Sequence, residues 1–159
     1  RTVVAVDALP QGALVFIEAL VDNGEGTQSV PQAGDLVKLT NNTHAAPYDA
    51  GSTQTVAFSH YNNLSAQLPI DPATGAFPAT IEEQTRQSLE NCKAVLAAAG
   101  AAMENVIKTT VFLSDMNNFA AMNGVYATFF EGACPARSAV EVARLPKDAL
   151  VEIECIAVL

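Results

Sequence analysis

The chain has 159 residues, of which 50% are hydrophobic and 16% charged, so it is globular, with room for one sizeable core and not for two full domains. Its formal net charge of −9 disfavours binding to nucleic acid or to anionic lipid, because both need clustered lysine and arginine. Its apolar runs are shorter than a membrane span. We therefore expect a small molecule as partner, with no nucleic acid and no membrane.

The first residues of the chain repeat a segment near its end. Aligned without gaps, residues 1–21 and 137–157 are identical at ten of 21 positions, too many for shared strand composition alone. The identical residues are Arg1, Val4, Val6, Leu9, Pro10, Ala13, Leu14, Val15, Ile17 and Glu18, which match Arg137, Val140, Val142, Leu145, Pro146, Ala149, Leu150, Val151, Ile153 and Glu154. We interpret residues 1–34 as the C-terminal strands of a preceding copy plus a linker, and residues 35–159 as one complete domain.

Within the partial copy, β-branched residues predict strands at 2–6 and 13–21, joined by a Leu-Pro-Gln-Gly turn. Residues 22–34 have the turn-forming composition of a linker. A two-stranded hairpin is seldom stable without a sheet to join. We therefore expect this segment to pack on the complete domain or on a neighbouring subunit.

The complete domain is expected to interleave strands with two helices. In chain order we predict a strand at 36–40, a polar loop at 41–53, a hairpin of 54–59 with 62–67, a turn at 69–75, a helix from a Thr80–Glu83 capping box to Gly100, a strand at 106–113, a helix from Ser114 or Asp115 to about Glu131, and strands at 137–144 and 149–158. The apolar stripe of the second helix would hold Met116, Phe119, Ala120, Tyr126 and Phe130, together with Asn123.

This order indicates an α+β fold, with one mixed sheet that carries both helices on one face. The other face, lined with valine and leucine, would be exposed in a single copy. We therefore expect self-association through that face.

The cysteines and histidines give no metal or disulfide pattern. Cys92, Cys134 and Cys155 are odd in number and lack metal-type spacing, which suits a reducing compartment and predicts burial for each. His44 and His60 are isolated in predicted loops, and no glycine loop has the context of a phosphate cradle. We expect no metal and no cofactor, and a cytoplasmic location with the mitochondrion as the alternative.

The best candidates for chemistry lie in the last two predicted strands. If these strands pair across Pro146, then Arg137, Glu141, Glu152 and Glu154 point to one face. Arg137 can bind a carboxylate through two parallel hydrogen bonds, or it is a surface salt bridge. Crowding and partial burial would raise the pKa of Glu152 and suit it to proton transfer, unless it is a solvated glutamate of an edge strand.

Asn123 on the apolar stripe is either a structural hydrogen-bonding residue or a substrate contact, and its spacing alone favours the structural role. Ser65, at the end of a predicted strand, has no recognisable histidine and acid partners for a nucleophile.

Three segments together resemble the Rid family, also called YjgF, over roughly residues 35–159. They are Leu64 to Gly75, Lys108 to Leu113, and Pro135 to Glu154, with its Pro-Ala-Arg-Ser and Glu-Ile-Glu motifs. The resemblance implies a chorismate-mutase-like α+β fold, a homotrimer packed through its open sheet faces, and active sites in the clefts between subunits.

The resemblance also implies a reaction and the residues that carry it. It implies hydrolytic deamination of 2-iminopropanoate and 2-iminobutanoate to the 2-oxo acid and ammonia. By resemblance, Arg137 holds the substrate carboxylate and Glu152 positions and activates water, while Ser65 and Asn123 line the cleft. An imine carbon is already electrophilic, so the reaction needs only a group that binds the substrate carboxylate, an oriented water and a residue that transfers protons.

This chain departs from the family pattern at a few positions. Gly51-Ser52-Thr53 stands where the family usually has Gly-Pro-Tyr, and Ala66 replaces the usual glycine beside the ligand. Phe16 stands in the partial copy at the place of Glu152, so that copy is not expected to form a second site of this kind. Two other functions are retained: an endoribonuclease or translation inhibitor, which the acidic charge disfavours, and a non-catalytic trimer that binds a metabolite.

Overall fold

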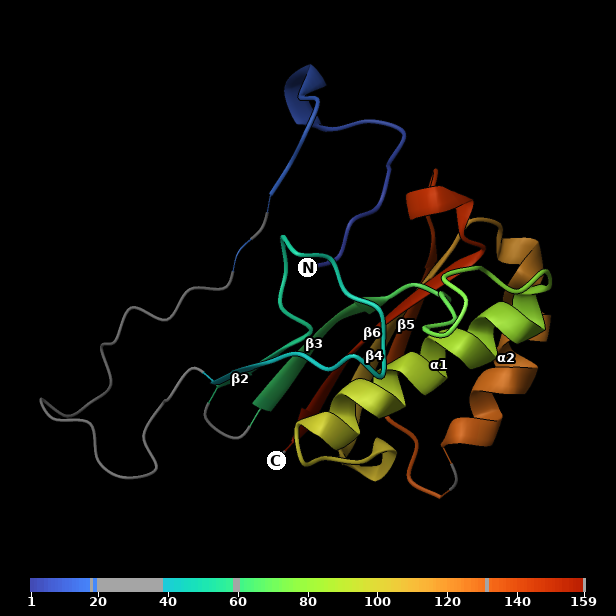
Figure 1. Cartoon of the computed structure of the whole chain (residues 1–159). Coiled ribbons are helices and arrows are strands. Elements are labelled where there is room, and N and C mark those ends of the chain that lie inside the picture. The colour runs from blue at the N-terminus through green and yellow to red at the C-terminus, as the bar shows by residue number, and fades with distance from the viewer. Residues whose placement is uncertain (18, 20–38, 59–60, 131, 159) are drawn as a thin grey trace, which may run out of the picture.

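A computed structural model describes residues 1–17, 19, 39–58, 61–130 and 132–158. The strands are β1 (Leu39–Asn41), β2 (Thr55–Phe58), β3 (Tyr61–Gln67), β4 (Val106–Leu113), β5 (Ala136–Glu141) and β6 (Val151–Val158), and the α-helices are α1 (Ile81–Ala98) and α2 (Phe119–Tyr126). Figure 1 shows the chain, with the helices packed beside the sheet. None of the described helices is long and apolar enough to cross a membrane.

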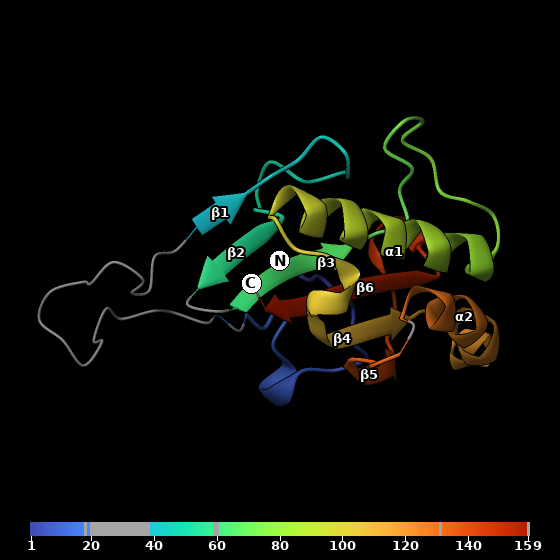
Figure 2. The ribbon, with the colours of Figure 1, turned by 90° about the horizontal axis from the view of Figure 1, so that it is seen from below.

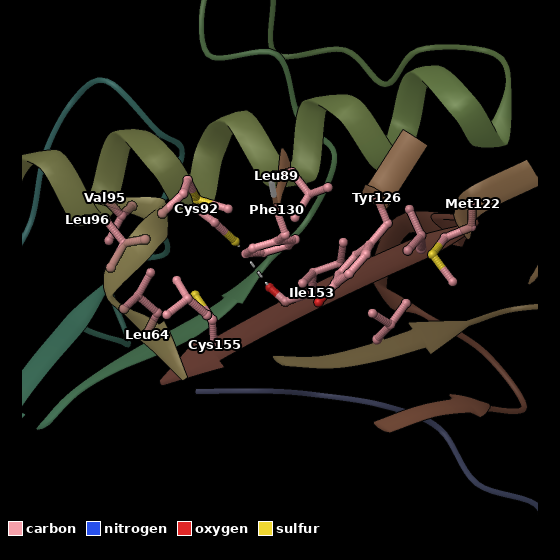
Figure 3. Packing of buried hydrophobic residues seen from close by; sticks show 14 of the residues in the cluster. Leu64, Leu89, Cys92, Val95, Leu96, Met122, Tyr126, Phe130, Ile153 and Cys155 are labelled. Atoms are coloured by element: carbon pink, nitrogen blue, oxygen red, sulfur yellow. Dashed lines mark hydrogen bonds between the residues drawn. The ribbon is translucent and has the colours of Figure 1, made fainter. Parts of the chain in front are cut away.

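One mixed sheet organises the fold, with strand order β1-β2-β3-β6-β4-β5. Every neighbouring pair is antiparallel except β4 and β5, which run parallel and are connected through α2. Figure 2 shows both helices against the sheet, and Figure 3 shows α1 on one side of the strands and the blue trace of the N-terminal segment on the other. The expected mixed sheet with helices on one face is confirmed.

Helix α1 begins and ends where its sequence predicts. The Thr80 side chain accepts from the Glu83 amide, and the Glu83 side chain accepts from the Thr80 amide, so the capping box is complete. At the other end Gly100 adopts φ +81°, and the amides of Gly100 and Ala101 bond back to Ala97 and Leu96. This is a Schellman termination, which satisfies the last carbonyls of the helix.

The second helical segment is shorter and more irregular than expected. Asp115 caps a 3₁₀ turn over Met116–Asn118, α2 follows, and a further 3₁₀ turn covers Ala127–Phe129. Glu131, the expected end, lies outside the described residues. The buried side chains of α2 are Met122, Val125 and Tyr126, so the expected stripe is wrong for Met116 and Ala120, which are exposed, and Asn123 is half-buried.

The core lies between α1, α2 and the helix-facing side of the sheet. Figure 3 shows Leu89, Cys92, Val95 and Leu96 of α1 above strand residues that include Ile153 and Cys155. Each fully buried leucine here contributes about 2 kcal/mol through removal of its apolar surface from water. The expected burial of cysteines holds for Cys92 and Cys155 and is wrong for Cys134, which is exposed.

The strands predicted at 137–144 and 149–158 exist, but they do not pair with each other. β4 lies between them, because β5 reaches it by a parallel crossover through α2 while β6 inserts between β3 and β4. The residues between them form a 3₁₀ turn over Pro146–Asp148, with Lys147 and Asp148 at positive φ. The predicted hairpin across Pro146 is therefore wrong, although both strands are right.

The partial copy forms no strand among its described residues. The segment 2–6 is extended with a single bridge from Ala5 to Arg144, residues 10–12 form a 3₁₀ turn, and residues 13–17 are irregular. The expected linker at 22–34 and most of the expected strand at 36–40 lie outside the described residues. Of the two expected kinds of packing, on the rest of the chain or on a neighbouring subunit, the first is seen for the start of the segment, because Val4 contacts a small cluster around Val142, Leu145 and Ala149. Residues 14–17 are exposed.

Candidate active site

A cavity of about 610 Å³ opens on the face of the sheet away from the helices. It is bounded by β3, by the start of β6, by the loop before β2, and by the first residues of the chain. Its lining residues are Arg1, Val3, Pro47, Tyr48, Asp49, Ala50, Ser52, Gln54, Ser65, Ala66, Gln67, Leu68, Ile70, Gly75, Pro146, Lys147 and Glu152. Three of the residues predicted for the site, Ser65, Ala66 and Glu152, are thus brought together.

Glu152 is the chemically distinctive group of this cavity. Its side chain is only 4% exposed, and its Oε2 atom has no hydrogen-bond partner among the described residues. Burial, followed by the negative charge of Glu154, raises the pKa of Glu152 to about 7, and the α-amino group of residue 1 opposes this shift. A carboxyl group with this pKa exchanges a proton readily near neutral pH.

Ser65 and Ala66 line the cavity on β3, the strand beside β6, where the pairing of the two strands has a bulge between Leu64 and Gln67. The Ser65 hydroxyl donates to the Thr53 carbonyl at 2.6 Å and accepts from the α-amino group of Arg1. Its orientation is therefore fixed by backbone, as suits a residue that shapes a binding site. Ala66 presents only a methyl group.

The loop before β2 is held by Gln54, a residue that sequence reasoning missed. Gln54 is 1% exposed, accepts from the Thr43 amide at 2.6 Å and donates to the Ala46 carbonyl at 2.9 Å. A glutamine directly before a β-branched strand gives no sequence signal for this role. Its bonds keep the Pro47–Ser52 wall in place over the cavity.

Arg137 and Asn123 form a separate group at the other side of the sheet. The Arg137 Nη1 donates to Asn123 Oδ1 at 2.7 Å, and the guanidinium lies 4.6 Å from the ring centroid of Tyr126 and 5.5 Å from that of Phe119. Such cation–π contacts hold an exposed guanidinium against the end of α2. The alternative reading of Arg137, a surface salt bridge, has no carboxylate partner among the described residues.

Arg137 and Glu152 therefore do not share a face, contrary to the sequence prediction. Arg137 pairs with Thr109 of β4, whereas Glu152 pairs with Phe112, three residues further on. Side chains alternate along a strand, so an odd offset places them on opposite faces. Glu141 lies with Arg137, and its carboxylate accepts from the Met116 amide at 2.6 Å; Glu154 lies with Glu152.

The fold and the cavity define an α+β protein with a helix-covered sheet face and, on the open face, a hollow built around one buried glutamate. The chain belongs to the Rid/YjgF family, since the family model described as endoribonuclease L-PSP matches residues 43–159. The fold and the family expected from the motifs are confirmed.

The matches to relatives and solved structures cover nearly the whole length of those proteins. The chain is 52% identical over 117 residues to RutC family protein PH0854 of Pyrococcus horikoshii, covering 72% of this chain and 93% of that protein. It is 48% identical over 124 residues to the 2-iminobutanoate/2-iminopropanoate deaminase of Escherichia coli K12, covering 75% and 94%. The crystal structure of E. coli TdcF with bound serine superposes with a TM-score of 0.74 at 45% identity, covering 77% of this chain and 99% of that one.

Proposed function

We propose that the Glu152 cavity hydrolyses 2-imino acids, such as 2-iminopropanoate and 2-iminobutanoate, to the 2-oxo acid and ammonia. The observation that carries the proposal is a buried carboxyl group, facing a cavity, whose pKa lies at about 7. The deaminase name of relatives that are 48% and 54% identical to this chain supports the same chemistry.

In this mechanism Glu152 moves a proton twice. The ionised carboxylate takes a proton from water as the water oxygen bonds to C2 of the protonated imine, which gives an amino alcohol. The protonated Glu152 then returns that proton to the amine nitrogen, and the C2–N bond breaks with its electron pair going to nitrogen. The C2 hydroxyl gives its proton to the departing ammonia as the oxo group forms, so nitrogen leaves as ammonium and Glu152 is again ionised. The net reaction consumes one water and releases ammonia.

The substrate carboxylate requires a cation beside Glu152. Arg137 is the candidate from the family resemblance, but its place on the opposite face means that it can serve only the cavity of another copy. This proposal therefore includes assembly as a homotrimer with sites between subunits, in which the open sheet face of each copy is covered. Asn123 would position Arg137 through their 2.7 Å hydrogen bond, and Ser65 and Ala66 would bound the substrate.

The test is the release of 2-oxobutanoate and ammonia from 2-iminobutanoate that a threonine dehydratase generates in the assay. Glu152→Gln keeps the shape of the side chain and removes the proton shuttle, so we expect a rate loss of about 10²-fold or more. Glu90→Gln, an exposed carboxylate on α1, is the matched control. A Glu152→Gln protein as fast as that control would refute the proposal.

The two other functions have their own outcomes. Binding of 2-oxobutanoate without any turnover would select a metabolite-binding protein, which Thr53 at the position of the family tyrosine favours. Cleavage of RNA that tracks the purified protein through successive columns would select the endoribonuclease, although the net charge of −9 opposes polyanion binding.

A further inference from the structure

The repeat seen in the sequence is also present in the backbone. Gln11 has φ 58° and ψ 23°, and its counterpart Lys147 has φ 56° and ψ 25°. The flanking residues agree as well, with ψ 155° at both Leu9 and Leu145, and ψ 145° and 148° at Ala13 and Ala149. Positive φ is uncommon outside glycine, so residues 9–13 have kept the specific turn of residues 145–149.

Residues 1–5 are seated on the open face of the sheet. The Ala5 amide donates to the Arg144 carbonyl, and the Ala143 amide donates to the Ala5 carbonyl, both at 2.9 Å. Val4 packs into the cluster of Val142, Leu145 and Ala149 together with Leu68, Phe77 and Phe112. Thr2 donates to Glu154, and Figures 2 and 3 show this segment crossing the face opposite the helices.

The position of residues 1–5 on the sheet places Arg1 at the cavity. The Arg1 guanidinium bonds to Asp49 and lines the cavity together with Ser65 and Glu152. A Cβ at Gly51 would lie 3.3 Å from Arg1 Nη1, so the missing side chain at Gly51 makes room for the guanidinium. Arg1 is also the residue that corresponds to Arg137 in the repeat.

We propose that residues 1–5 occupy, in cis, the groove that residues 137–141 of a second copy would take, and that Arg1 supplies the carboxylate-binding cation of the Glu152 cavity in the unassembled chain. The groove accepts residues 1–5 through the backbone bonds of Ala5, the Val4 side chain and the Arg1 guanidinium, and residues 137–141 carry the same arginine and valine in the same order. This inference rests on the proposed function, in which Arg137 of another copy has this role once the copies assemble. Assembly through this face then requires residues 1–5 to leave the groove.

Binding of 2-oxobutanoate, measured by titration calorimetry on the full chain, tests the role of Arg1. Arg1→Ala is expected to weaken binding about 10-fold or more, and Arg1→Lys less, because lysine keeps the charge and loses the bidentate fork. Arg86→Ala, an exposed arginine of α1, controls for the loss of one positive charge. Unchanged affinity of the Arg1→Ala variant would overturn the proposal. If Arg137→Ala then weakens binding while Arg1→Ala does not, the cation comes from a second copy.

Sedimentation of full-length variants tests the competition for the groove. Val4→Asp unseats the segment by placing a charge in an apolar cluster, so self-association should tighten about 10-fold. Val6→Asp is the matched control, since Val6 is 51% exposed. Equal association of the two variants would contradict the competition. The two proposals are refuted by different results. An active Glu152→Gln protein would refute the proposed function, whereas unchanged ligand affinity of Arg1→Ala would refute the inference about Arg1.

Discussion

Arg137 and Glu152, the two residues that family resemblance joins in one reaction, lie on opposite faces of one sheet, three register positions apart along β4. Under the proposed function, each Glu152 therefore needs a guanidinium other than that of Arg137 in the same copy. The chain offers two: Arg137 of another copy, and Arg1 of its own partial repeat. The predictions below separate the chemistry of Glu152 from the stability of the fold around it.

Glu152 should make stability depend on pH between about 4.5 and 7. Its pKa is raised from 4.5 to about 7 on folding, so in this range the folded state holds a proton that the unfolded state releases. Stability then falls as pH rises through the window, by on the order of 3 kcal/mol, and levels off above it. Melting temperatures of wild type and Glu152→Gln at several pH values check this, and the variant should lack this slope. Parallel curves for the two proteins would be inconsistent with the raised pKa.

The pH dependence of imine hydrolysis should report the same group. Glu152 acts first as a base, so kcat/KM should rise as the pH increases through about 7. The charge of Glu154 is the second cause of the raised pKa, so Glu154→Gln should move the rise to lower pH. Rate profiles of both proteins with dehydratase-generated 2-iminobutanoate provide the measurement. If kcat/KM of Glu154→Gln rises at the same pH as that of wild type, the charge of Glu154 does not raise the pKa of Glu152.

Gln54→Ala should destabilise the protein and loosen one wall of the cavity. The substitution leaves the Thr43 amide and the Ala46 carbonyl without their partner, which costs about 1–3 kcal/mol for each buried group left unsatisfied. Urea denaturation measures the loss, and 2-oxobutanoate affinity measures the effect on the cavity. Full stability in the variant would mean that the loop does not depend on this side chain.

The three thiols should differ in reactivity in the folded protein. Cys134 is exposed, whereas Cys92 and Cys155 are buried. The neighbouring Cys155 thiol, followed by burial, raises the pKa of Cys92 well above its usual value. Thiolate is the reactive form, so a thiol reagent at pH 8 should modify Cys134 quickly and the other two only after unfolding. Cys134→Ser should abolish the fast phase. Two or more fast-reacting thiols in wild type would contradict the packing of the core.

Local sequence signals predicted much of the fold because they act over a few residues. The capping box fixes the start of α1 and Gly100 fixes its end, and the strand predicted at 106–113 has the observed bounds of β4. The pairing of β5 with β6 was wrong because a turn between two strands does not reveal that a third strand lies between them. β6 is buried or half-buried at every position, as a central strand is, but Glu152 and Glu154 on one of its faces hide this in the sequence.

Only the part of the site that local sequence motifs specify was predicted correctly. Ser65, Ala66 and Glu152 line one cavity, and the motifs that carry them are local. Arg137 and Asn123 contact each other but not this cavity, because the register of β5 on β4 is a long-range property. Arg1 was expected to be a structural remnant, and only the seat of residues 1–5 on the sheet revealed it beside Glu152.

The turn shared by residues 9–13 and 145–149 forms in two unlike surroundings. Leu145 and Ala149, which flank one turn, are 2% and 1% exposed, whereas their counterparts Leu9 and Ala13 are half-buried and exposed. A conformation that persists without burial is specified by its own five residues, through the fixed φ of proline and the extended caps on either side. The direction of the chain at this turn therefore depends little on the residues packed around it.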